Sequence, residues 1–134
     1  MILISCVENA LGLLFNHRRC SRDRAVCGRI LERAGNELWL AESSAGLFRE
    51  FPEAALHIVS DMSQVPEGGY CFWELPAPEA EPEGLVLYSW NRDYPSDEKF
   101  VFPGGEDRWR LTAETDFEGF SHPLITERLY DRGE

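Results

Sequence analysis

The sequence lacks a hydrophobic segment long enough to cross a membrane or to act as an export signal. Its apolar start, residues 1–7, has only about a third of the length that a spanning helix needs, and no basic residue precedes it. We therefore expect a soluble, cytoplasmic protein without a membrane partner.

The sequence also lacks the cysteine spacing of a metal site. Its four cysteines, Cys6, Cys20, Cys27 and Cys71, form neither a CxxC motif nor another zinc-ligand pattern, so we predict no metal. In a reducing compartment all four are expected to be free thiols, three of them small core residues. Cys20 differs because the arginines around it favour a thiolate, which makes it a candidate reactive thiol.

Positive charge is scarce. Thirteen Lys and Arg residues against 24 Asp and Glu residues give a net charge of −11, which argues against a nucleic-acid partner. The positive charge is nevertheless concentrated, because residues 1–33 contain six arginines and only three acids. Any site for an anion is therefore expected in the first quarter of the chain.

The length and the composition are those of one globular domain. A chain of 134 residues is near the commonest domain size, and 43% hydrophobic residues are enough for an ordinary core. The chain shows no internal repeat and no linker. The sequence therefore predicts a single domain over residues 1–134.

The order of apolar segments predicts an α/β fold. Residues 1–7 are apolar without alternation, which is typical of a strand buried on both faces. Strands that first alternate with helices and later follow one another predict a three-layer sandwich. Its central sheet would be mostly parallel, with helices on both faces and an antiparallel hairpin at the end. The other predicted strands are residues 37–41, 55–60, 70–74, 84–90, 109–111 and 124–131.

Two helices and two loops complete the predicted fold. Ser21 is the expected N-cap of a helix with one apolar and one basic face, which runs to about Arg33. Gly35 would follow as its C′ residue. Ser43 or Ser44 would cap a second, brief helix up to residue 51. The segments from residue 8 to 19 and from 76 to 83 are expected to be loops.

Two stretches of the chain share the motif order of a known family. The first reads ILISCVENALGLLFNHRRCSRDRAV, and the second reads LVLYSWNRDYPSDEKF followed by Trp109 and by SHPLITERLYDR. In this order the chain resembles the dihydrofolate reductases over about residues 1–34 and 84–132. The resemblance implies that family's fold and, allowing one deletion after Gly12, aligns Asp23 with its pterin-binding carboxylate. It also implies that Asp97 bonds the loop at residues 12–16.

The chain departs from that family where NADPH and folate bind. The family's Pro-Trp before the helix is replaced by HRRC, residues 17–20, and its phosphate-binding turn by Glu42-Ser43-Ser44. Its Gly-Gly pair falls near Trp73-Glu74, where bulky side chains prevent the nicotinamide from approaching the backbone. The chain thus resembles a divergent, shortened dihydrofolate reductase. We predict no cofactor, although the resemblance alone would suggest NADPH, and we do not expect reduction of dihydrofolate.

Small bacterial proteins of this pattern sometimes carry the name ribonuclease Z. That activity needs a two-zinc cluster of the form His-x-His-x-Asp-His. This chain has only the isolated His17, His57 and His122. We therefore do not expect a zinc ribonuclease.

An arginine cluster is the main candidate ligand site. Arg18, Arg19, Arg22 and Arg24 lie at the start of the predicted helix, where free N–H groups also attract anions. The alternative is a solvated face that pairs with the acidic remainder of the chain or with a protein partner. Ser43 and Ser44 could bind a phosphate at the second helix, or could simply cap it.

Asp23 has two interpretations. It could act as a general acid or ligand anchor if the protein is an enzyme, or favour the helix dipole and pair with its flanking arginines.

Three functions follow from the sequence. They are a small-anion-binding domain with a dihydrofolate reductase-like fold, an acidic interaction or regulatory module, and a divergent reductase with another substrate. The sequence leaves the ligand, the oligomeric state and the existence of an enzyme activity open.

Overall fold

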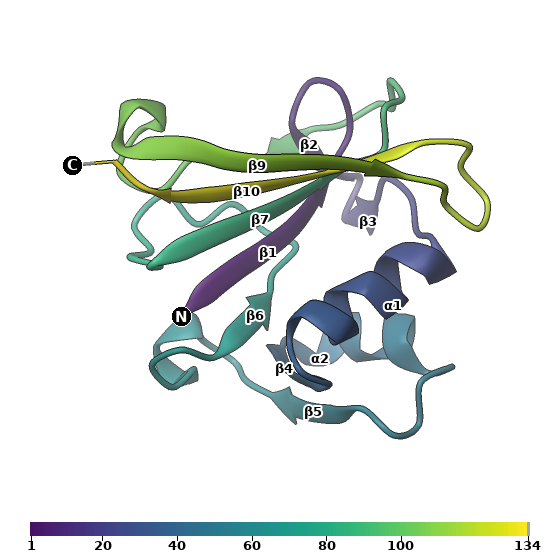
Figure 1. Ribbon diagram of the computed structural model, residues 1–134, viewed down its shortest axis with the longest axis horizontal. Helices are drawn as coiled ribbons and strands as arrows, with labels where there is room; N and C mark the ends of the chain where they lie inside the picture. The colour runs from purple at the N-terminus through teal and green to yellow at the C-terminus, as the bar shows by residue number, and fades with distance from the viewer. Residues whose placement is uncertain (134) are drawn as a thin grey trace.

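A seven-stranded sheet runs through the centre of the protein, whose computed structural model describes residues 1–133 (Figure 1). Its strands are β1 (Ile2–Val7), β4 (Glu37–Leu40), β5 (Ala55–Ile58), β6 (Tyr70–Phe72), β7 (Gly84–Ser89), β9 (Trp109–Phe117) and β10 (Ile125–Arg132). They lie in the order β5-β4-β6-β1-β7-β10-β9. β1 pairs in parallel with β6 and β7, whereas β10 pairs antiparallel with β7 and β9. The predicted parallel sheet with a final antiparallel hairpin is confirmed.

Both helices lie on the same face of this sheet. α1 (Arg24–Arg33) and α2 (Glu42–Ala45), which continues into the 3-10 turn Gly46–Phe48, pack on one apolar cluster. The edge of Phe48 meets the ring of Phe72 with centroids 5.7 Å apart, which anchors the short helix to β6. Neither helix, nor any other in residues 1–133, has the length and apolar character to cross a membrane.

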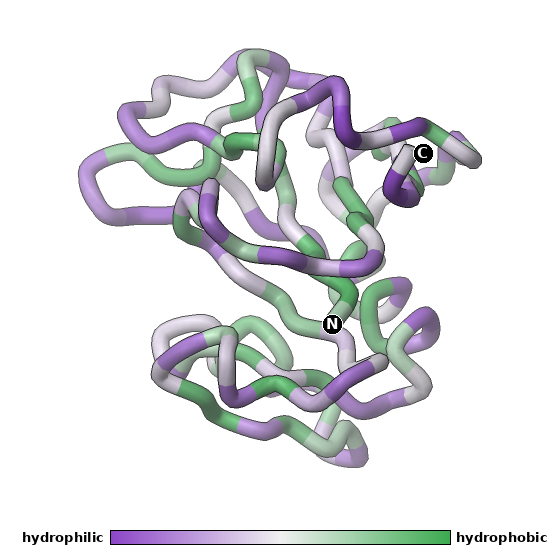
Figure 2. Tube along the Cα trace, turned by 90° about the vertical axis from the view of Figure 1, so that its left-hand side faces the viewer, coloured by the Kyte–Doolittle hydropathy of each residue, from purple (hydrophilic) through white to green (hydrophobic). Residues whose placement is uncertain are grey.

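The opposite face is covered by a small sheet and loops. This sheet contains β3 (Arg18–Arg19), β2 (Gly12–Phe15) and β8 (Glu98–Lys99), and its apolar residues join a second buried cluster. The prediction of helices on both faces is therefore wrong. Residues 76–83 form the predicted loop, because a proline-rich acidic segment cannot supply an apolar helix face. Figure 2 shows hydrophobic residues along the strands in the middle and hydrophilic residues in the outer loops.

A β-hairpin occupies part of the segment that was predicted as a loop. β2 and β3 pair antiparallel, with Phe15 opposite Arg18. The two residues between them, Asn16 and His17, have φ values of 52° and 65°. Positive φ at both central residues is typical of a two-residue hairpin turn whose twist matches the strands. Strands this short leave little periodicity in the sequence, so the hairpin was missed.

The helix ends differ from the prediction at the N-termini. Asp23, not Ser21, is the N-cap of α1, and its carboxylate accepts hydrogen bonds from the N–H groups of the first turn. Gly35 follows the C-cap with a φ of 66°, so the predicted C′ glycine is confirmed. The prediction of a serine cap for α2 is wrong. Ala41 is the N-cap. Ser44 lies inside the helix, where its hydroxyl donates to the Glu74 carboxylate and not to a backbone group of the helix.

The basic face of α1 is anchored to the sheet by one buried carboxylate. Glu127 of β10 has a side chain only 2% exposed and accepts hydrogen bonds from Arg29 and Arg33, at 3.1–3.2 Å. Tyr88 Oη donates a further hydrogen bond to Glu127 at 2.7 Å. This carboxylate fixes the position of α1 over the sheet, and therefore the width of the space beside the helix.

A tight contact at Gly12 holds the start of β2 against the end of β1. The Gly12 N–H donates to Glu8 Oε2 at 2.7 Å, and a Cβ at this position would collide with that carboxylate and with the Ser96 side chain. We predict that Gly12→Ala lowers the free energy of unfolding by about 1–3 kcal/mol, measured by urea denaturation. Gly46→Ala is the control, because its Cβ would meet only the Arg49 side chain at 3.9 Å. Equal stabilities of the two variants would contradict the prediction.

Candidate functional site

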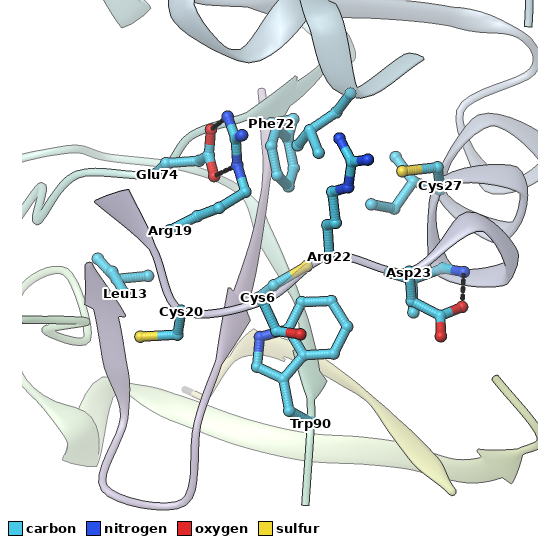
Figure 3. A pocket seen from close by; sticks show the side chains of 14 residues that line it. Cys6, Leu13, Arg19, Cys20, Arg22, Asp23, Cys27, Phe72, Glu74 and Trp90 are labelled. Atoms are coloured by element: carbon cyan, nitrogen blue, oxygen red, sulfur yellow. Dashed lines mark hydrogen bonds and ion pairs between the residues drawn. The ribbon is translucent and has the colours of Figure 1, made fainter. Parts of the chain in front are cut away.

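A small cavity, partly open to solvent, lies at the carboxyl ends of β1 and β6, between the sheet and α1 (Figure 3). Cys6, Phe72 and Trp90 supply its wall on the sheet side, and Val26 and Cys27 supply its wall on the helix side. Its volume of about 20 Å³ is room for a single water molecule. Ligands of parallel sheets bind at the carboxyl ends of the strands, where this cavity lies. The side chains that line the cavity nevertheless leave little room in it for a ligand.

The thiols around this cavity are held in their neutral form. Burial raises the pKa of Cys27 to about 11 and raises the pKa of Cys6 well above its ordinary value. The pKa of Cys20 is also raised, first by burial and then by the Glu8 carboxylate. This shift opposes the thiolate that the sequence predicted at Cys20, because burial and the carboxylates of Glu8 and Asp97 outweigh the charge of Lys99.

Arg19 separates the cavity from a first open space, the hairpin hollow, which has a volume of about 540 Å³. The guanidinium of Arg19 forms two hydrogen bonds with the Glu74 carboxylate, at 2.8 and 2.9 Å (Figure 3). Ser44 Oγ donates to the same carboxylate at 2.6 Å, and the Ser43 carbonyl accepts from Arg19 at 3.2 Å. Arg18 also lines this hollow. Arg19 and Ser44 are therefore already occupied by an internal anion.

The second open space, the arginine hollow, lies between the start of α1 and the segment after α2. Its volume is about 520 Å³, and it is lined by Arg22, Arg24 and Arg49. Arg24 lies 3.5 Å from the Glu50 carboxylate, with both side chains more than half exposed. Within residues 1–133, Arg22 and Arg49 form no ion pair. The rings of Phe51 and Phe120 complete the rim and give the hollow an apolar side.

The structure therefore divides the predicted arginine cluster. Arg22 and Arg24 face the arginine hollow, Arg18 faces the hairpin hollow, and Arg19 lies between the two in its ion pair with a carboxylate. Arg49, which the sequence did not identify as a candidate, also faces the arginine hollow. Because charges from one sequence cluster point to different spaces, they do not form one four-arginine site.

Asp23 is buried, and both of its oxygens are occupied. Oδ1 accepts hydrogen bonds from the N–H groups of Ala25 at 2.8 Å and Phe120 at 2.9 Å, and Oδ2 accepts from Ser121 N–H at 2.8 Å. His122 Nδ1 lies 2.9 Å from Oδ2. Burial acts to raise the pKa of the Asp23 carboxyl, but hydrogen bonds from Phe120, His122 and Ser121 outweigh it, so the pKa lies well below the usual range. In Figure 3 the carboxylate points away from the centre of the cavity.

The remaining candidate residues have local partners. Asp97 Oδ2 accepts a hydrogen bond from the Asn16 N–H at 3.1 Å, a contact with the loop that the resemblance implied. His57 stacks on Trp39 with centroids 4.5 Å apart, and its Nε2 lies 3.0 Å from Glu37 Oε2. No group of three or more metal-ligating side chains is present in the described part of the chain.

Sequence reasoning missed two of the residues that shape the site. Arg49 has no neighbouring basic residue in the sequence, and only the turn after α2 brings it opposite Arg22. Glu74 was noted only as a bulky residue at the end of a strand, whereas it binds Arg19 and Ser44. Both roles depend on tertiary placement, so no local pattern in the sequence signals them.

Comparisons with known proteins define the fold. No protein-family model and no curated protein sequence matches the chain. Solved structures do match, 170 chains in all. One is a dihydrofolate reductase from Enterococcus faecalis complexed with NADP(H) and RAB-propyl, with a TM-score of 0.63 and 10% identity over 99% of this chain and 96% of that chain. At this identity the likeness shows the fold alone, which is dihydrofolate reductase-like.

Proposed function

We propose that this dihydrofolate reductase-like domain binds a small anionic ligand in the arginine hollow. The observation that carries the proposal is the pair Arg22 and Arg49, which line one space of about 520 Å³ and form no ion pair within residues 1–133. In a protein of net charge −11, two such guanidinium groups facing one hollow are well placed to attract an anion.

The lining of the hollow indicates the chemistry of the ligand. Arg24 adds a third positive charge, which Glu50 at 3.5 Å offsets only in part because both groups are exposed to water. Phe51 and Phe120 offer apolar contact beside the charges. A carboxylate or phosphate with a small apolar or aromatic part fits both features. Arg18 and Ser43 line the hairpin hollow and not the arginine hollow, so they would not contact this ligand.

Asp23 has a positioning role in this proposal. Its oxygens already accept hydrogen bonds from the start of α1 and from residues 120–122, so it joins the two segments that border the hollow. Residues 22–24 and Phe120 therefore keep a fixed separation. A ligand would contact the arginines and the aromatic rim while Asp23 holds that geometry.

NADPH, which the similar reductase binds, does not fit the residues at the end of β6. The Glu74 carboxylate lies there and already occupies the Arg19 guanidinium and the Ser44 hydroxyl, so neither group is free to bind a pyrophosphate. The adjoining helix α2 has only four residues and begins without a side-chain cap. We therefore propose a ligand that does not require the hairpin hollow, and we derive no hydride-transfer step.

A thermal-shift experiment tests the proposal. We predict that pyrophosphate or citrate raises the melting temperature of the wild-type protein, because a ligand at 100 times its Kd adds about 2.7 kcal/mol. Arg22→Ala and Arg49→Ala should each weaken binding about tenfold or more, since hydrogen bonds to charged groups contribute about 1.5–3 kcal/mol. Arg110→Ala is the control, because Arg110 lies on β9 in an exposed pair with Asp131.

The same experiment separates the alternatives. No shift with either anion, or an equal shift in Arg22→Ala, Arg49→Ala and Arg110→Ala, would refute the arginine hollow as a site. Oxidation of NADPH with any substrate would favour a divergent reductase, and a stoichiometric protein that co-purifies would favour an interaction module.

A further inference from the structure

Ser21, His122 and Asp23 form a continuous hydrogen-bonded chain beside the small cavity. Ser21 Oγ lies 2.9 Å from His122 Nε2, and His122 Nδ1 lies 2.9 Å from Asp23 Oδ2. This is the order of contacts that activates a serine nucleophile, with a base that is oriented by a carboxylate. We propose that the triad makes Ser21 a nucleophile that cleaves small carboxylic esters. The inference does not depend on anion binding.

The contacts around the imidazole decide which of its nitrogens acts as the base. Asp23 is ionised and can only accept, so Nδ1 carries the proton and Nε2 presents its lone pair to the Ser21 hydroxyl. The Trp90 ring stacks on His122 with centroids 4.8 Å apart, and Tyr94 Oη lies 3.4 Å from Nε2. These neighbours hold the ring in the orientation that proton transfer from Ser21 requires.

The three residues differ in their exposure to solvent, as a nucleophile and its buried supporting pair should. Asp23 and His122 are 3% and 5% exposed, so their interaction is shielded from water, whereas Ser21 is partly exposed and lines the cavity. Sequence reasoning noted Ser21 only as a helix cap and His122 only as an isolated histidine. The triad arises because the segment before β10 folds back onto the start of α1.

The backbone N–H groups of the two residues that follow Ser21 are candidate donors for a developing oxyanion. Within residues 1–133, the backbone N–H groups of Arg22 and Asp23 donate no hydrogen bond to another residue. They directly precede the N-terminus of α1, where the helix dipole also favours negative charge. N–H groups in this position can stabilise the negative oxygen of a tetrahedral intermediate.

The reaction proceeds in two balanced steps. Ser21 Oγ attacks the ester carbonyl carbon and gives its proton to His122 Nε2; the bond to the alcohol oxygen then breaks, and that proton leaves with the alcohol. Water next attacks the acyl-Ser21 carbon, its proton passes through Nε2 to Ser21 Oγ, and the carboxylic acid departs. The pocket that Ser21 lines is narrow, so we expect the ester to be a small one, such as an acetate.

Covalent labelling with a fluorophosphonate, together with hydrolysis of p-nitrophenyl acetate, tests the proposal. We expect peptide mass mapping to find the label on Ser21, and Ser21→Ala to lower kcat/KM by at least about 100-fold. His122→Asn should lose both activities, because the amide can still donate to Asp23 but cannot accept a proton. Ser60→Ala, a change of an exposed serine far along the chain, should behave as wild type.

Three results would overturn the proposal. The first is a wild-type protein that carries no label on Ser21, the second is a folded His122→Asn variant that hydrolyses the ester as fast as wild type, and the third is a Ser21→Ala variant with the activity of wild type. If His122→Asn fails to fold, as judged by its melting curve, the labelling map of the wild type and the kinetics of Ser21→Ala still decide. A Ser21→Ala protein that loses only stability would show that the chain of hydrogen bonds is structural.

Discussion

Glu127→Ala is expected to lower the free energy of unfolding by about 3–5 kcal/mol, the largest effect of any single change considered. Its side chain is 2% exposed and accepts hydrogen bonds from Arg29, Arg33 and Tyr88. Removing it leaves two guanidinium groups beside each other and a buried hydroxyl without its acceptor. Because α1 forms one side of the arginine hollow, the loss should also loosen the candidate site.

The free energies of unfolding of Glu127→Ala and of its control Glu114→Ala are to be compared by urea denaturation. Glu114 lies on the neighbouring strand β9 and pairs with Arg128 at 2.7 Å, but both side chains are exposed by a third or more. An exposed pair of this kind contributes less than about 1 kcal/mol. Equal losses for the two variants would show that Glu127 does not anchor α1.

Asp23→Ala is expected to be the second most damaging change, with a loss of about 2–4 kcal/mol. The substitution removes the N-cap of α1 and leaves the N–H groups of Phe120 and Ser121 without their acceptor. It also removes the partner of His122 Nδ1. Asp23→Asn should lose less, since one side-chain oxygen remains to accept from the helix N–H groups.

The same carboxylate predicts a dependence of stability on pH. The pKa of Asp23 is lower in the folded protein than in the unfolded chain, so its contribution is complete above about pH 4 and declines as the pH falls below that value. Urea midpoints at pH 7, 4 and 3 should therefore fall more steeply for wild type than for Asp23→Asn. Other carboxylates, including Glu127, titrate in both proteins and do not affect the difference. Parallel pH profiles would contradict the assignment.

The sequence predicted the parts of the fold that depend on local patterns. Apolar segments located β1, β4 and β7, and Gly35 marked the end of α1 because a residue with a φ of 66° favours glycine. The sequence predicted Ser21 as the N-cap of α1, whereas the structure has Asp23 in that position. Both residue types cap helices, and only the contact with residues 120–122 shows why the carboxylate takes that position.

The candidate site was predicted less completely, since its geometry depends on residues far apart in the chain. The excess of arginine in residues 1–33 located the positive charge correctly, but not the pairing of Arg19 with Glu74, 55 positions away. Arg49 and His122 reach the start of α1 only through tertiary packing. Local composition therefore indicated where charge is available, and the fold decided which charges face a common space.

Titration of the ¹⁵N-labelled protein with pyrophosphate, followed by backbone amide chemical shifts, tests the central claim most directly. We predict shifts in residues 22–24, 46–51 and 120–121, which border the arginine hollow, and their loss in the double variant Arg22→Ala/Arg49→Ala. Absence of shifts, or shifts confined to residues 17–19 and 43–44 around the hairpin hollow, would contradict the assignment of the ligand site.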